Sequence, residues 1–143
     1  MFRVPTYLAP SPIEGIGVFT PLPIAAGTLL WEITTGVDWE MTPAELDGFP
    51  EPYQTSLRRW CYENERGLFV LCGDNARFMN HSFAPNCDDS GELTVAVRDI
   101  APGEELTCDY RSFDRPARTT GRVEFIEPIL PGRTLNASPG ADT

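Results

Sequence analysis

Two short stretches of this chain carry most of the residue types that can do chemistry. The first motif, residues 77–87 (Arg-Phe-Met-Asn-His-Ser-Phe-Ala-Pro-Asn-Cys), contains two asparagines and the single histidine; the second motif, residues 103–110, reads Gly-Glu-Glu-Leu-Thr-Cys-Asp-Tyr. Asn, Ser and Pro favour turns because their side chains bond nearby backbone or fix the backbone angle. Apolar residues are nevertheless interleaved at Phe78, Met79 and Phe83. We therefore predict two buried, irregular polar segments, which form either a functional site or a rigid turn.

The two motifs resemble the signature of the SET-domain protein lysine methyltransferases, an R-F-x-N-H-S-x-x-P-N stretch followed by G-E-E-L-T-x-D-Y. Upstream, the glycine segment, residues 14–19 (Glu-Gly-Ile-Gly-Val-Phe), resembles the G-x-G-V-F motif of that family, and residues 73–76 resemble its G-N-x-A stretch. These pieces occur in the family's order over residues 12–113. A lone G-x-G is a weak signal, whereas the ordered set is specific.

The resemblance implies a fold, a cofactor and a substrate class. The fold is mainly β, the β-clip-like SET fold of small curved sheets, in which the second motif passes under a loop of the first as a pseudoknot. The implied cofactor is S-adenosyl-L-methionine, and the implied partner is a lysine-rich basic protein. The substrate amine, whose free pKa is about 10.4, must lose its proton before transfer. Burial beside the positive sulfonium lowers that pKa, so a narrow aromatic channel suffices without a dedicated base.

The resemblance also assigns residues to the cofactor site: Gly15, Ile16, Gly17, Val18, Arg77, Asn80, His81 and Phe113. Alternatives remain for several of them. The glycine pair is also typical of a plain β-turn. A lone histidine is more often a core residue with its hydrogen bonds satisfied, and we favour Arg77 as a brace for an Asp or Glu over a contact with the cofactor carboxylate. Phe113 stacks on adenine, lines the channel or simply packs in the core.

The catalytic assignments are Tyr110, beside the transferred methyl, and Tyr62, as a second channel tyrosine. Cys108 and Phe78 are assigned to the substrate channel. Cys108 occupies a position that is usually Phe or Tyr in the family. Because Cys is small and a weak donor, we expect room for a methylated amine and di- or trimethyl-lysine as product. No cysteine follows residue 108, so the zinc segment of many eukaryotic members is missing, and the tail or a second subunit, as in a possible dimer, must complete the site.

Composition limits the other classes of function. The net charge is −10, and all 11 basic residues are arginine. This charge argues against direct nucleic-acid binding and favours a cationic partner, although many soluble proteins are simply acidic. The cysteine spacing predicts no metal site, because C-x-x-C is missing. A hydrolase with a Cys-His or Ser-His pair would have to use His81, because it is the single histidine of the chain. The remaining alternative is an inactive SET-like module that binds a basic tail.

The elements that must position these motifs are short. We predict strands at residues 3–7, 28–34, 68–72 and 93–97, and a further strand that begins at residue 18. A helical insert is predicted at about 42–60. Thr42 and Glu45 form a predicted capping box, and Tyr53, Leu57 and Trp60 mark one face of a second helix. We expect one domain over residues 1–130, with order fading after Phe113, a strand or short helix at 123–130 and a disordered tail at 131–143. No apolar run reaches the ~20 residues of a membrane span and no signal peptide is evident, so we expect a cytoplasmic protein.

Overall fold

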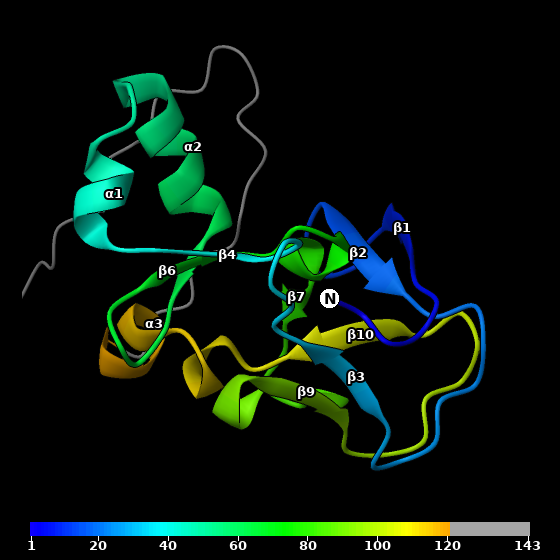
Figure 1. Cartoon of the computed structure of the whole chain (residues 1–143). Helices are drawn as coiled ribbons and strands as arrows, with labels where there is room; N and C mark the ends of the chain where they lie inside the picture. The colour runs from blue at the N-terminus through cyan, green and yellow to red at the C-terminus, as the bar shows by residue number, and fades with distance from the viewer. Residues whose placement is uncertain (121–143) are drawn as a thin grey trace, which may run out of the picture.

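The computed structural model describes residues 1–120, which form three small sheets with short helices around them (Figure 1). The mainly β class is therefore confirmed. The first sheet has the strand order β1-β2-β10-β7, the second β3-β9-β8 and the third β4-β6-β5. The strands are β1 (Tyr7–Pro10), β2 (Ile16–Phe19), β3 (Leu29–Glu32), β4 (Trp39–Met41), β5 (Tyr62–Glu63), β6 (Phe69–Leu71), β7 (Asn80–His81), β8 (Cys87–Asp88), β9 (Leu93–Ala96) and β10 (Glu105–Cys108). The helices are α1 (Pro43–Asp47), α2 (Glu51–Trp60) and α3 (Arg115–Thr120), with 3₁₀ turns η1 (Asn75–Phe78), η2 (Ser90–Glu92) and η3 (Tyr110–Ser112).

The first sheet brings the two motifs together. β7, from the first motif, runs parallel to β10, from the second, and Thr107 pairs with Asn80 as Cys108 pairs with His81. β10 also pairs antiparallel with β2 of the glycine segment. The prediction that both motifs are buried side by side is confirmed. The prediction that both motifs are irregular was wrong for residues 105–108 of the second motif, which form a paired strand, and the first motif contributes the two-residue strand β7.

The main core lies between the first two sheets and contains residues of both motifs. Its buried members are Val18, Ile24, Leu30, Met79, Cys87, Ala96, Ile100, Leu106 and Cys108. Phe78, Tyr110 and Phe113 are partly buried against it. The predicted strand at 93–97 does alternate, but it buries the small residues Thr94 and Ala96 and exposes Leu93 and Val97. All four cysteines are free thiols, and Cys61 alone among them is not fully buried.

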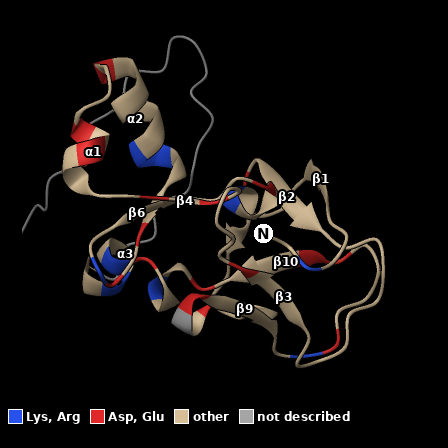
Figure 2. Ribbon diagram, viewed as in Figure 1, with Lys and Arg blue, Asp and Glu red and all other residues tan. Residues whose placement is uncertain are grey.

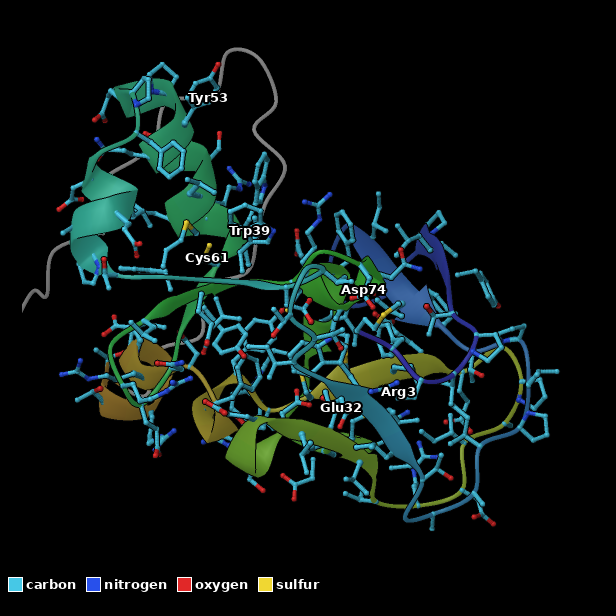
Figure 3. All side chains as sticks on the ribbon, in the orientation of Figure 1. Arg3, Glu32, Trp39, Tyr53, Cys61 and Asp74 are labelled. Atoms are coloured by element: carbon cyan, nitrogen blue, oxygen red, sulfur yellow. The ribbon has the colours of Figure 1, made fainter. Side chains whose placement is uncertain are left out.

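The predicted helical insert is confirmed, and Thr42 and Glu45 form the expected capping box at the start of α1. The two helices stand together at one end of the molecule (Figure 1). The second helix, α2, carries Tyr53, Leu57 and Trp60 as predicted, but Tyr53 and Trp60 are 61% and 44% exposed. Tyr53 lies near the outer end of the helix (Figure 3). The periodic pattern marks a face, but among the elements of residues 1–120 the main contacts of α2 are with α1 and β6, and these leave much of that face exposed.

Several predicted boundaries move. The first edge strand starts at Tyr7 rather than residue 3, β2 starts at Ile16, and the strand predicted at 28–34 covers only Leu29–Glu32. Order does not fade at Phe113, because Asp114 accepts a hydrogen bond from the Ala117 amide and starts α3. The predictions for residues 123–143 lie outside the described residues. Among the helices of residues 1–120, none has the length and apolarity needed to cross a bilayer.

Candidate functional site

Two adjoining cavities lie beside the paired motifs. The smaller, of about 330 Å³, is bordered by the glycine segment, the start of the first motif and the end of α2. The larger, of about 1190 Å³, lies between α2, α3 and the strands β5 and β9. Both volumes are within or near the range of ligand sites in proteins. The side chains that border both cavities are Arg59, Trp60, Arg77, Met79 and Tyr110.

Asn80 fixes the glycine segment beside the smaller cavity. Its side-chain amide donates to the carbonyl oxygens of Glu14 and Ile16, at 3.1 and 3.3 Å, and to Oε1 of Glu105 at 2.7 Å. The hydroxyl of Ser11 donates to the same carboxylate at 2.8 to 2.9 Å and accepts from the Ile13 amide. The structure therefore adds Ser11 and Glu105, to which the sequence reasoning gave no role.

The four residues of the glycine segment assigned to the cofactor do not have equivalent positions. Gly15 and Ile16 border the smaller cavity, and Gly15 has a φ of +45°, which favours glycine. Gly17 instead packs against Glu105, because a Cβ there would lie 2.1 Å from Oε1. The side chain of Val18 is fully buried in the core. Neither Gly17 nor Val18 borders the smaller cavity, and both lie in the paired strand β2.

His81 is buried and borders neither cavity, and only one of its two ring nitrogens has a hydrogen-bond partner within residues 1–120. Its Nδ1 accepts a hydrogen bond from the Tyr110 amide at 3.1 Å, so the proton of the neutral ring belongs on Nε2. Nε2 is buried and has no partner within residues 1–120. Burial lowers the pKa of His81, while Asp109, 3.7 Å from Nδ1, opposes the shift. His81 is therefore a neutral ring whose Nε2–H has no acceptor among residues 1–120.

Tyr110 borders both cavities. Its hydroxyl donates to the Met79 carbonyl at 2.5 Å, which ties the end of the second motif to the first. Burial raises its pKa, so the phenol keeps its proton at neutral pH. Its ring meets those of His81 and Phe113 edge to face, with centroids 5.4 and 5.7 Å apart. The side chain thus has one fixed orientation at the junction.

Aromatic side chains continue from Tyr110 into the larger cavity. The Phe113 ring meets the Tyr62 ring edge to face at 4.9 Å, and burial raises the pKa of Tyr62. Cys108 borders the same cavity and is only 1% exposed. The structure therefore places Phe113 with the channel residues rather than in the smaller cavity. Phe78, assigned to the channel, borders the smaller cavity instead.

The basic residues at the junction have no carboxylate partners in the described chain. Arg77 lies over the rings of Phe78 and Trp60, at 4.9 and 5.6 Å, and forms no ion pair within residues 1–120. The preferred interpretation of Arg77 as a brace for an Asp or Glu was therefore wrong for this part of the chain. Arg59, which the sequence reasoning missed, borders both cavities and likewise has no ion pair among the described residues. Only its place at the end of an exposed helix could have suggested it.

The chain is similar to known proteins in sequence and in structure. A SET domain matches residues 15–111. The histone-lysine N-methyltransferase ash1 of Drosophila melanogaster is 33% identical over 112 residues, 68% of this chain and 5% of ash1. The histone-lysine N-methyltransferase trr of the same species is 32% identical over 126 residues, 79% of this chain and 5% of trr. An H3 lysine-4 specific histone-lysine N-methyltransferase of Chaetomium globosum is 44% identical over 62 residues, 38% of this chain and 6% of the relative.

These relatives are much longer, and this chain spans about one twentieth of the length of ash1 and trr. Among solved structures, a Plasmodium falciparum protein described as a candidate histone methyltransferase has a TM-score of 0.56 at 18% identity, covering 76% of this chain and 94% of that one. This likeness shows a shared fold. Since the family match extends over more than half of the residues, the chain belongs to the SET domain family.

Proposed function

We propose that this chain is a protein-lysine N-methyltransferase that uses S-adenosyl-L-methionine and acts on a basic, histone-like protein. The observation that carries the proposal is Tyr110, which borders both cavities with its hydroxyl fixed on the Met79 carbonyl. A bisubstrate reaction of this type needs two sites that meet at one point, since positioning alone supplies up to about 7–11 kcal/mol of the barrier. The printed names of the relatives, histone-lysine N-methyltransferases, support the same reaction.

The residues around the smaller cavity fit the proposed cofactor. Arg59 and Arg77 offer two guanidinium groups, with no carboxylate partner in residues 1–120, to a carboxylate of the ligand. Gly15 and Ile16 lie at the cavity wall, where the backbone can approach a ligand closely. When bound, the cofactor supplies a methyl group on a positive sulfonium.

The residues around the larger cavity suit a lysine side chain. Tyr62, Phe113 and Tyr110 provide apolar walls that exclude water from the amine. Loss of water disfavours the charged ammonium, which lowers the pKa of the amine and frees its lone pair. Tyr110 keeps its proton and orients oxygen atoms, its own hydroxyl and the Met79 carbonyl, at the junction.

The test is methyl transfer from labelled cofactor to purified core histones, followed by mass spectrometry of the modified residues. The chain has no lysine, so any labelled lysine must belong to the substrate protein. We expect lysine methylation by the wild type and loss of at least about 100-fold in rate in Tyr110→Phe. Calorimetric titration with S-adenosylhomocysteine distinguishes the enzyme from the alternative, an inactive module that binds a basic tail. Such a module would neither bind S-adenosylhomocysteine nor transfer label to any basic protein.

A further inference from the structure

The strongest feature that the proposed function leaves unused is Asp89, at the larger cavity. It follows β8 and precedes the η2 turn, and it borders the cavity together with Tyr62, Cys108 and Tyr110. Its neighbour Asp88 is exposed, bonds to Ser90 and does not border the cavity. Two adjacent carboxylates in one turn thus face different environments, and only Asp89 faces the aromatic channel.

Asp89 is held in place by a buried partner. The hydroxyl of Thr94, itself 4% exposed, donates to Oδ1 of Asp89. The thiol of Cys108 lies against the same carboxylate. Apart from this thiol, no donor of residues 1–120 is hydrogen-bonded to the second oxygen, Oδ2. One half of the carboxylate is therefore fixed while the other half is available at the cavity wall.

The other acidic side chains at this cavity have partners. Three are ion-paired with arginines: Glu63 with Arg115, Glu65 with Arg118, and Glu92 with Arg66. Asp114 accepts hydrogen bonds from two backbone amides. Basic positions on α2 and α3, the helices that border the cavity, are visible in Figure 2, yet none of the described arginines is paired with Asp89. Among the described carboxylates of the cavity, Asp89 alone lacks both a cation and a backbone donor.

A half-buried carboxylate without a cation is costly, because it has lost part of its water and gained no opposite charge. Burial accordingly raises the pKa of Asp89. A cationic ligand in the channel would remove this cost by supplying both charge and N–H donors. An ammonium group at the end of an alkyl chain matches the site in charge, while Tyr62 and Phe113 match the chain in apolarity.

We infer that Asp89 is the anionic group that binds the substrate ammonium at the wall of the larger cavity, before the amine loses its proton. The inference rests on the proposed function and specifies how its substrate is recognised. A carboxylate can accept a hydrogen bond only while the nitrogen retains an N–H. Asp89 therefore favours unmodified, monomethyl and dimethyl amines over the trimethyl form, which has no N–H to donate.

The test is a binding titration that does not depend on turnover. The full chain, saturated with S-adenosylhomocysteine, is titrated by NMR with n-butylammonium chloride, which imitates the end of a lysine side chain. Asp89→Asn removes the charge but keeps an oxygen for Thr94, and Asp88→Asn removes the same charge from the neighbouring residue. We expect Asp89→Asn to weaken binding by about tenfold or more, the scale of one charge-assisted hydrogen bond, and Asp88→Asn to match the wild type. The uncharged control, 1-pentanol, should bind all three proteins alike.

Equal affinity of the two variants for n-butylammonium would overturn the inference. A second measurement needs no variant and so holds if Asp89→Asn fails to fold. The wild type should bind n-butylammonium about tenfold more tightly than trimethyl-n-butylammonium, and equal affinities would also refute the role of Asp89. If the titrations succeed but no basic protein is methylated, the proposed function fails while the amine site stands.

Discussion

Replacing Gly17 with alanine should destabilise the protein, because the added Cβ would clash with the side chain of Glu105. Gly17 lies in β2, and its φ is not in the left-handed region, so alanine is allowed by the backbone itself. The added Cβ would lie 2.1 Å from Oε1 of Glu105 and 3.1 Å from Cβ of Ser11. The carboxylate cannot move away freely, because Ser11 and Asn80 both donate to it. Relief of the clash therefore requires the loss of at least one of these hydrogen bonds.

The magnitude follows from those bonds. Hydrogen bonds to a charged group contribute about 1.5–3 kcal/mol each, and overpacking typically costs about 1–3 kcal/mol. The change from Gly to Ala regains about 0.4–1 kcal/mol by restricting the unfolded chain. The net destabilisation of Gly17→Ala should be about 2–4 kcal/mol. At about 3 °C per kcal/mol for a protein of this size, Tm should fall by roughly 6–12 °C.

Urea unfolding of a double-mutant cycle measures this directly. Glu105→Ala alone should destabilise the protein, because Ser11 and Asn80 lose their acceptor. In the Glu105→Ala background the clash is gone, so Gly17→Ala should no longer destabilise. We expect a coupling free energy of about 2 kcal/mol or more between the two positions. Additivity to within about 0.5 kcal/mol would show that the contact between Gly17 and Glu105 does not constrain the fold, and our reasoning would be wrong.

Four further predictions concern the site. Tyr110→Phe should lower the methyl-transfer rate by about 100-fold or more with little change in S-adenosylhomocysteine affinity, because one preorganised hydroxyl is lost; wild-type turnover would contradict its role. Asn80→Ala should release the glycine segment, lower the free energy of unfolding by about 1–3 kcal/mol and weaken S-adenosylhomocysteine binding in calorimetry, and unchanged affinity would count against it. Cys108→Tyr should shift the product on a lysine peptide from dimethyl toward monomethyl, because a larger side chain fills the buried space; a wild type that stops at monomethyl would disprove the argument. Burial lowers the pKa of His81 in the folded protein, so the unfolded chain binds this proton at a higher pH. The free energy of unfolding should therefore fall as the pH drops below about 6.5, by up to about 1.4 kcal/mol per pH unit. In urea titrations at several pH values, His81→Gln should remove this contribution to the slope.

The sequence alone was sufficient where the determining interactions are local or where residue order is specific. The capping box of Thr42 and Glu45 was predictable because both partners lie within one helical turn. The side-by-side burial of the two motifs was predictable because they resemble an ordered family signature, and the pairing of Asn80 with Thr107 agrees with it. The mainly β class followed from short segments broken by Pro and Gly.

Tertiary structure alone decided which of the polar residues face a cavity. Asp88 and Asp89 have the same side chain and are adjacent in sequence, but only the fold places one in solvent and the other beside Thr94 and Cys108. The exposure of α2 was equally hidden, because periodicity marks a helix face without showing whether another element covers it. Glu105 joins Ser11 and Asn80 across 94 and 25 residues of sequence. Contacts at such separations depend on where the chain returns in space, which no local pattern of residue types encodes.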